Sequence, residues 1–304
     1  MRVNPNNNQP LIVAGPSGVG KSAFAVELAL RFDGEIVGAD AYQVYAGMEV
    51  LTAQPGPELT TRVPHHLFGF LAPSEPFDAA RYAAMAREKI SAISARGRRP
   101  ILVGGSGLYL KALTHGLADL PPVDAGLRAE LMALSLEELQ ARLDRVDPEA
   151  RQRIDIQNPR RVIRALEIQA QTGQSVAEQR QLWAAPPTLE HEGFLLLRDR
   201  PELETRIEEN VRTMWRKGVL AEVAALKNIG PTAARAIGLR EIRAVVNGDS
   251  DRDDASAAMV RSTCQYAKRQ LTWFRNQFSF KPIDLNGLQH MRKFVFDTFP
   301  PGPA

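Results

Sequence analysis

Cysteine is almost absent from this chain, which has 304 residues and a single cysteine, Cys264. One cysteine excludes a disulfide within the chain and a zinc site built from cysteines. No stretch approaches the roughly 20 apolar residues that a membrane-spanning helix needs. The first ten residues are polar and do not resemble a signal sequence. We therefore expect a cytoplasmic protein that has no membrane segment.

The chain also lacks a strong charge of either sign. Its 38 lysines and arginines face 35 acidic residues, so the formal net charge is only +3. A balance this small indicates nothing about a polyanionic partner, and the distribution of charge along the chain matters more. The hydrophobic share of 44% is enough to form a large core.

Short apolar runs alternate with helical patterns in the first part of the chain. Residues 11–14, 35–40 and 100–103 are typical of buried strands, and a helical pattern begins at Lys21. Asp78 is placed to cap a later helix, whose predicted apolar face comprises Ala79, Tyr82, Ala83, Ala86, Ile90 and Ile93. Strands that alternate with helices predict an α/β fold with a parallel sheet covered by helices.

The pattern changes after Leu120-Pro121-Pro122, where helical periodicity continues without a convincing strand as far as Pro186-Pro187. A further strand is predicted at residues 194–197, and helices follow it. We therefore predict four segments: the first part of the α/β core at 1–119, a mostly helical insertion domain at 120–187, the rest of the core with basic C-terminal helices at 188–283, and a tail at 284–304.

A glycine-rich motif follows the first predicted strand. Its eight residues match the phosphate-loop pattern G-x-x-x-x-G-K-[S/T] in full: Gly15, Pro16, Ser17, Gly18, Val19, Gly20, Lys21 and Ser22. Backbone N–H groups of such a loop bind phosphate oxygens, the lysine adds a positive charge, and the serine hydroxyl binds Mg²⁺. The motif makes the predicted fold a P-loop-type sheet, yet a nucleotide kinase or an ATPase carries it equally well.

Two further features follow predicted strands. Asp40 ends the second strand, where a carboxylate is either a general base or a turn cap or an outer partner of the metal. The turn Gly104-Gly105-Ser106-Gly107 follows the third strand and is too short for a second phosphate loop. Its glycines indicate either close approach of the backbone to a ligand or an ordinary strand-to-helix turn.

A basic stretch lies near the C-terminus. Residues 255–283 contain no acidic residue, and aromatic residues alternate there with the basic residues Arg261, Lys268, Arg269, Arg275 and Lys281. This composition suits a phosphate backbone and stacked bases, and it also suits an amphipathic helix whose charges face water. Arg160, Arg161 and Arg164 recur at helical spacing and leave the same two interpretations open.

Seven segments in this order and spacing resemble the tRNA dimethylallyltransferases, also called tRNA isopentenyltransferases. They are G-P-S-G-V-G-K-S, then D-A-Y-Q-V-Y-A-G-M-E-V-L-T-A-Q-P from Asp40, V-P-H-H-L from Val63, P-I-L-V-G-G-S-G-L-Y-L-K-A-L from Pro100, R-R-V-I-R-A-L-E from Arg160, A-I-G-L-R-E from Ala236 and Y-A-K-R-Q-L-T-W-F-R-N from Tyr266. The resemblance extends from about residue 11 to about residue 277.

The resemblance implies a reaction in which dimethylallyl diphosphate donates its five-carbon group to N6 of adenine 37, in the anticodon stem-loop of a tRNA. It implies that the glycine-rich loop holds the donor with Mg²⁺ at Ser22, and that Lys21, Asp40 as general base and Ser106 take part in catalysis. The residues that it implies for tRNA binding are Asp40, Ala41, Tyr42, Gln43, Ser106, Arg128, Arg160, Arg161, Arg164, Arg235, Gly238, Arg240, Lys268, Arg269, Gln270, Thr272, Trp273 and Arg275.

The chain departs from the family pattern at five positions. Ala41 stands where serine is usual, Gln54 where lysine is usual and Ser106 where threonine is usual. Cys264 replaces an arginine, and Asn210 replaces an arginine that helps to bind the diphosphate. Arg206 and Arg212 are the nearby candidates to supply the missing cation.

Three other functions stay open from the sequence. A small-molecule kinase explains the loop and Asp40 but gives the basic stretch no role. An adenylate isopentenyltransferase acts on free nucleotide and shares the loop, although the helical insertion suits tRNA better. A tRNA-binding protein without activity is the third, and the intact Lys21, Ser22 and Asp40 argue against it. We expect a monomer in each case.

Overall fold

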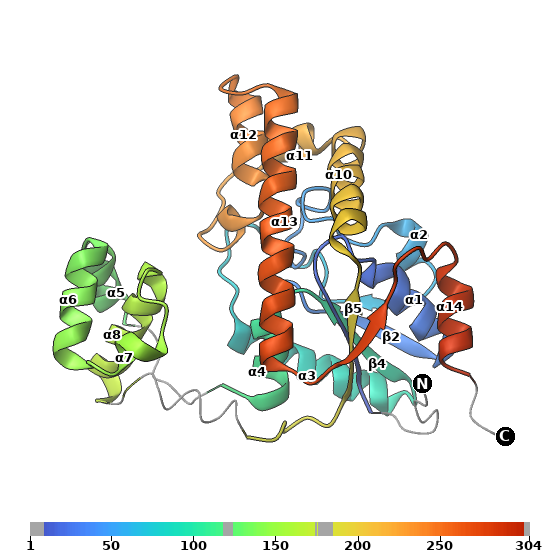
Figure 1. Cartoon of the computed structure of the whole chain (residues 1–304), viewed down its shortest axis with the longest axis horizontal. Coiled ribbons are helices and arrows are strands. Elements are labelled where there is room, and N and C mark those ends of the chain that lie inside the picture. Colours follow the sequence, from blue (N-terminus) through green and yellow to red (C-terminus); the bar gives the residue numbers. More distant parts are fainter. Residues whose placement is uncertain (1–8, 118–123, 174, 176–184, 301–304) are drawn as a thin grey trace. The chain divides into compact units, whose positions relative to one another are not determined.

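A computed structural model describes residues 9–117, 124–173, 175 and 185–300 (Figure 1). The chain divides into two compact units. Unit 1 combines residues 1–113 with residues 189–304, and unit 2 comprises Thr114–Thr188. The second boundary falls near the predicted Pro186-Pro187, whereas the predicted boundary at residues 120–122 lies outside the described residues. None of the helices in the described ranges has the length and apolar character needed to cross a bilayer.

Unit 1 is built on a parallel sheet of six strands, which confirms the predicted α/β class. Across the sheet the order is β3-β2-β4-β1-β5-β6. The strands are β1 (Leu11–Ala14), β2 (Gly34–Gly38), β3 (His65–His66), β4 (Arg99–Gly104), β5 (Glu192–Leu197) and β6 (Lys281–Asp284). The central strands β1, β2 and β4 are buried along their whole length, as expected for a parallel sheet covered on both faces.

Alternate residues of these strands pack into two hydrophobic clusters. Ile12 and Leu102 belong to a cluster on one face of the sheet, which includes side chains of α3 (Ala79–Ala95), α4 (Gly107–His115) and α13 (Arg252–Gln277). Val13 and Ile101 belong to the cluster on the other face, with side chains of α1 (Lys21–Arg31) and α14 (Met291–Thr298). The period of two along each strand thus divides the core into two layers.

Local signals position the helices as the sequence predicts. Asp78 accepts a hydrogen bond from the Arg81 N–H at the start of α3. The buried residues of α3 are those predicted: Ala79, Tyr82, Ala83, Ala86, Ile90 and Ile93. Helix α1 begins at Lys21, directly after the glycine-rich loop, so its free N–H groups face that loop.

A group of helices covers the last part of unit 1 (Figure 1). It contains α10 (Arg200–Arg216), α11 (Val219–Ala225), α12 (Leu239–Asn247) and α13, with a short 3₁₀ turn at Ala233–Arg235. Helix α13 packs against both α10 and α12. The remaining short helix of unit 1 is α2 (Pro57–Thr60).

The prediction of a tail at residues 284–304 is wrong for its described part. Strand β6 pairs with β5 from Lys281 to Asp284, and α14 packs on α1. Phe299 is buried, and its ring contacts the rings of Phe24, Phe32 and Phe194 at centroid distances of 6.2, 6.2 and 5.2 Å. This segment therefore completes one face of the core, and residues 301–304 lie outside the described residues.

Unit 2 is a small helical bundle, drawn in green in Figure 1. Its described helices are α5 (Ala125–Met132), α6 (Leu136–Val146), α7 (Ala150–Arg153) and α8 (Pro159–Thr172). Ser135 and Glu138 form a reciprocal capping box at the start of α6, and Asn158 caps α8 ahead of Pro159. Leu131, Leu139, Leu143 and Val162 are among the residues that form its core.

Candidate active site

Four neighbouring strands end at one edge of the sheet. Because β2, β4, β1 and β5 are parallel and adjacent, the residues that follow them converge there. Asp40 follows β2, Ser106 follows β4, the glycine-rich loop follows β1, and Arg198 follows β5. Residues that lie far apart in the sequence are therefore brought to one site by the topology.

A cavity of about 350 Å³ opens at this edge. The predicted site residues that line it are Ser17, Gly18, Gly20, Lys21, Ser22, Asp40, Tyr42 and Gln43. Gly15, Pro16 and Val19 are buried beside the cavity. The structure thus brings the loop and the carboxylate of Asp40 together around one space.

Lys21 and Asp40 have opposite charges within this cavity. The Lys21 Nζ donates a hydrogen bond to the Pro16 carbonyl at 2.9 Å. Burial lowers the pKa of Lys21 to about 8, and the nearby Asp40 opposes this change. Burial raises the pKa of Asp40, while its hydrogen bond from the Tyr42 N–H (3.0 Å) and the charge of Lys21 act in the opposite direction. A buried carboxylate with a raised pKa is well suited to accept a proton.

Ser106 lies next to Asp40 in space. Its Oγ accepts a hydrogen bond from the Ala41 N–H at 2.8 Å, and its own N–H donates to the Ala39 carbonyl at 3.2 Å. Burial raises the pKa of the Tyr266 phenol, Asp40 raises it further, and a hydrogen bond with Ser106 lowers it. Ser106 therefore fixes the backbone that carries Asp40 and contacts an aromatic residue that lines the cavity.

Gln270, predicted as a tRNA contact, is buried and bonded within the protein. Its Oε1 accepts from the N–H (2.8 Å) and the Oγ (3.2 Å) of Ser17, and its Nε2 donates to the Gly105 carbonyl at 3.0 Å. A Cβ atom on Gly105 would lie only 2.0 Å from that Nε2, and one on Gly107 would lie 2.1 Å from the Trp273 ring. The close approach at these two glycines is thus made by α13, whereas the sequence left open a ligand or an ordinary strand-to-helix turn.

Helix α13 also presents basic side chains to solvent. Lys268, Arg269, Thr272 and Arg275 are exposed, and the Arg269 guanidinium lies 5.8 Å from the centre of the Tyr266 ring. Among the described residues, no carboxylate lies within ion-pair distance of Lys268, Arg269 or Arg275. The stretch is therefore an amphipathic helix, and contact of its exposed basic side with a phosphate backbone stays a prediction.

The other predicted tRNA contacts of unit 1 lie around α12. Arg235 and Arg240 are exposed, and Arg240 pairs with Glu241 at 3.1 Å. Gly238 is buried, and a Cβ there would lie 2.8 Å from the Met259 Cε. Gly238 thus allows α12 to pack closely on α13.

In unit 2, two predicted contacts share a buried partner. Glu167 is fully buried and accepts from Arg128 at 2.6 and 2.7 Å and from Arg164 at 3.2 Å. Arg160 and Arg161 are exposed at the start of α8. The Glu167 carboxylate therefore holds the guanidinium groups of two of the four arginines in unit 2 that were predicted to contact tRNA.

Among the departures, Asn210 lines the cavity, and so does Arg206 from the same helix. Arg212 pairs instead with Glu208 and Glu209, both at 3.3 Å. Gln54 donates to the Tyr45 carbonyl at 2.8 Å. Burial raises the pKa of the Cys264 thiol, which disfavours the reactive thiolate.

The apolar part of the cavity was not predicted from the sequence. Its apolar lining includes Leu51, Ile207, Val211, Met214 and Met259. Ile207, Val211 and Met214 repeat at helical spacing along α10, a pattern that also describes an ordinary buried face. The cavity thus has a charged end at the loop and an apolar wall beyond it.

Comparison with known proteins decides the family. A family model described as IPP transferase matches residues 43–277. The chain belongs to this family. A tRNA dimethylallyltransferase of Akkermansia muciniphila is 42% identical over 267 residues, covering 88% of this chain and 90% of that protein. The predicted family and the prediction of a prenyltransferase enzyme are confirmed.

Two solved structures share the fold of this IPP transferase. The full-length tRNA isopentenylpyrophosphate transferase of Bacillus halodurans is 32% identical, with a TM-score of 0.70 and coverage of 96% of this chain and 94% of that one. A eukaryotic dimethylallyltransferase acting on tRNA is 25% identical, with a TM-score of 0.79 and coverage of 96% and 76%.

The donor atoms at the loop suit Mg²⁺. This ion prefers oxygen ligands and retains water and substrate phosphate oxygens in its coordination sphere. The Ser22 hydroxyl lines the cavity beside Lys21. The described residues contain no cluster of three or more histidine, cysteine or acidic side chains that could hold a metal alone. Coordination of Mg²⁺ by the Ser22 hydroxyl together with phosphate oxygens stays a prediction.

The pKa of Lys21 makes anion binding depend on pH. Lys21 is protonated below about pH 8 and loses its charge above that value. Because a bound anion requires the charge, the Kd for an alkyl diphosphate should rise above pH 8 by up to about tenfold per pH unit. Lys21→Arg, which stays charged, should show no such rise in calorimetric titrations. A wild-type Kd that stays constant from pH 7 to 9.5 would contradict the assignment.

Proposed function

We propose that this IPP transferase moves the dimethylallyl group of dimethylallyl diphosphate to N6 of adenine 37 in tRNA. The products are N6-dimethylallyladenosine and diphosphate. The observation that carries the proposal is the cavity itself, where Lys21 and Ser22 lie at one end, the Asp40 carboxylate is beside them, and an apolar wall lies beyond. The names of the relatives agree with this reaction.

The cavity suits the two parts of such a donor. The N–H groups of the glycine-rich loop and the Lys21 ammonium bind the diphosphate. The apolar wall, which includes Leu51, Val211 and Met214, receives the five-carbon chain and excludes water from it. The Ser22 hydroxyl would hold Mg²⁺ beside the diphosphate, and the bound ion would supply further positive charge to stabilise the leaving group.

Asp40 acts on the acceptor amine. The bond between the allylic carbon and the diphosphate oxygen breaks, a bond forms between that carbon and N6, and the amine proton passes to the Asp40 carboxylate. The raised pKa of Asp40 makes this transfer favourable. Ser106 keeps the backbone of residue 41 in place, and the Tyr266 ring offers a surface for a base taken out of its stack.

The exposed basic side of α13 suits the phosphate backbone of the acceptor. Lys268, Arg269 and Arg275 lie on the helix that also carries Tyr266 into the cavity. A stem-loop bound along these cations would therefore present its loop near the site of transfer. We also propose that the exposed Arg160 and Arg161 of unit 2 bind tRNA, and that the enzyme acts as a monomer in the cytoplasm.

Incubation with dimethylallyl diphosphate, Mg²⁺ and unmodified tRNA tests the reaction. Mass analysis of the digested nucleosides should show adenosine heavier by one dimethylallyl group in place of one hydrogen. A parallel incubation with AMP should give no prenylated nucleotide. Product from AMP alone would support an adenylate isopentenyltransferase, and label from ATP γ-phosphate on a small acceptor would support a kinase.

Asp40→Ala should lower kcat by about 10²- to 10⁴-fold, because the amine proton loses its acceptor. The Kd for dimethylallyl diphosphate should change little, since Lys21 and the loop remain. Single-turnover transfer measured beside donor titration separates the two quantities. Turnover near that of the wild type would exclude the role of general base.

Lys268→Ala combined with Arg269→Ala should weaken tRNA binding and reduce its salt dependence. Each lost phosphate contact should lower the slope of log K against log salt by about 0.7–0.9. The matched control is Arg292→Ala with Lys293→Ala, which removes the same charge from the exposed side of α14. If the slope of log K against log salt were the same in the α13 variant and in the α14 control, the α13 residues would make no phosphate contact.

A further inference from the structure

One arginine of α10 differs from the others. Arg200 pairs with Glu204 at 2.7 Å, Arg212 with Glu208 at 3.3 Å, and Arg216 with Glu209. Arg206 is the exception, because no carboxylate in the described part of the chain lies within 4.0 Å of its guanidinium nitrogens. A cation placed among acidic residues yet not paired with any of them is available to an external anion.

Arg206 also lies at the glycine-rich loop. Its Nε donates to the Gly18 carbonyl at 2.9 Å, and its side chain lines the cavity with Lys21. Its Nη2 lies 3.6 Å from the position that a Cβ on Gly20 would occupy, close to the first residue of α1. The N-terminal end of that helix favours phosphate, so the guanidinium reaches the place where an anion is expected.

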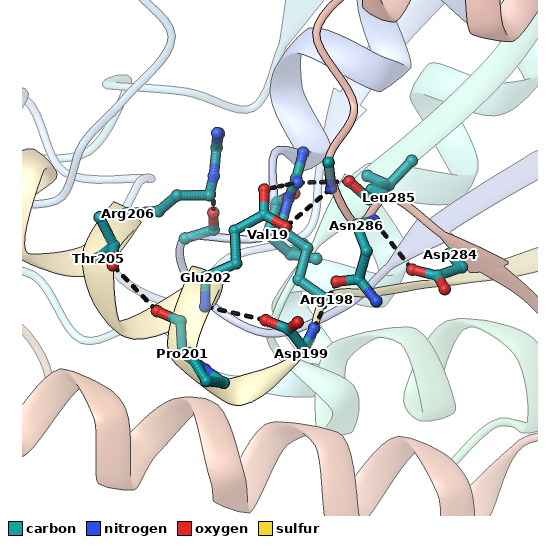
Figure 2. Close-up of polar contacts among 12 residues, drawn as sticks. Val19, Arg198, Asp199, Pro201, Glu202, Thr205, Arg206, Asp284, Leu285 and Asn286 are labelled. Atoms are coloured by element: carbon teal, nitrogen blue, oxygen red, sulfur yellow. Dashed lines mark hydrogen bonds and ion pairs between the residues drawn. The ribbon is translucent and has the colours of Figure 1, made fainter.

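The neighbouring Arg198 shows the contrast (Figure 2). Its Nε donates to the next loop carbonyl, that of Val19, at 3.1 Å. Its Nη1 is bonded to the Leu285 carbonyl and to the Glu202 carboxylate, so its charge is neutralised inside the protein. Arg206 uses only Nε for the loop, and its two terminal nitrogens have no hydrogen-bond partner among the described residues.

We propose that Arg206 binds the diphosphate of the donor through its two terminal nitrogens and supplies the cation that is missing at Asn210. The proposal rests on the function proposed above. A guanidinium held through Nε presents its terminal N–H groups in a fixed plane, which suits bidentate binding of phosphate oxygens.

The electrostatics of the loop support this role. Burial lowers the pKa of Arg206, and the charge of Arg198 lowers it further, whereas Glu202 opposes the change. A guanidinium nevertheless stays charged at any physiological pH. The positive charges of Arg206 and Lys21 therefore lie at one short loop, and a bound diphosphate would stabilise both.

Asn210 is a position to which the positive charge of Arg206 can be moved by substitution. It lies four residues after Arg206 on α10, so the two side chains share one face of the helix, and both line the cavity. An arginine introduced at position 210 would place a guanidinium one helical turn further along the same wall. It should replace part of the function of Arg206.

The test measures binding of inorganic diphosphate by calorimetry and steady-state transfer to tRNA. Arg206→Ala should weaken diphosphate binding by about 10- to 100-fold, the effect of losing charged hydrogen bonds. It should raise the KM for the donor while the Kd for tRNA stays unchanged. Arg206→Ala with Asn210→Arg should regain at least tenfold of the lost affinity. Arg216→Ala, the matched control on α10, should change neither quantity.

Several outcomes would overturn the proposal. Unchanged diphosphate affinity in Arg206→Ala is one, and an equal loss in Arg216→Ala is another. If Arg206→Ala does not fold, Arg206→Gln replaces it. A wild-type affinity for diphosphate in that variant would also contradict the proposal. A wild-type enzyme that transfers no dimethylallyl group, yet loses diphosphate affinity with Arg206, would refute the proposed function and leave this assignment intact.

Discussion

The hydrogen bonds of one buried amide hold the site together. Gln270 on α13 accepts from Ser17 in the loop after β1 and donates to Gly105 in the turn after β4. The loop and the turn follow adjacent strands, but the pairing between β1 and β4 ends at Ala14 and Gly104. Gln270 therefore ties the basic helix to the glycine-rich loop and to the turn after β4, so the proposed acceptor along α13 would have a defined position relative to the proposed donor.

The electrostatics of the site follow from placing charged side chains in a half-buried cavity. Lys21 and Asp40 each lose hydration there, and the two groups respond with a lowered and a raised pKa. Burial disfavours the charge of Lys21 and of Arg206, so an anion that entered the cavity would stabilise both groups. In the proposed reaction, burial would serve proton transfer as well, since it makes Asp40 a stronger base than an exposed carboxylate.

Local patterns made part of this structure predictable. The position of the glycine-rich loop between β1 and α1, the cap at Asp78 and the apolar face of α3 depend on neighbours within a few turns, and they were predicted correctly. The partners of Gln270 were not, because 253 residues separate it from Ser17. Strand β6 was missed because K-P-I-D has a proline and two charges, which only an edge strand tolerates. The sequence offered Arg206 and Arg212 equally as the missing cation, and only their contacts in the structure distinguish them.

The misjudged C-terminal segment has a further consequence for the loop. Arg198 is buried, and it joins the Val19 carbonyl to the Leu285 carbonyl directly after β6. Glu202, its carboxylate partner, also accepts from the Gly287 N–H at 3.0 Å. A buried guanidinium is stable only while all these partners stay in place. The segment after β6 therefore stabilises the loop through Arg198, while Arg206 and Lys21 line the cavity in which we propose that the diphosphate binds.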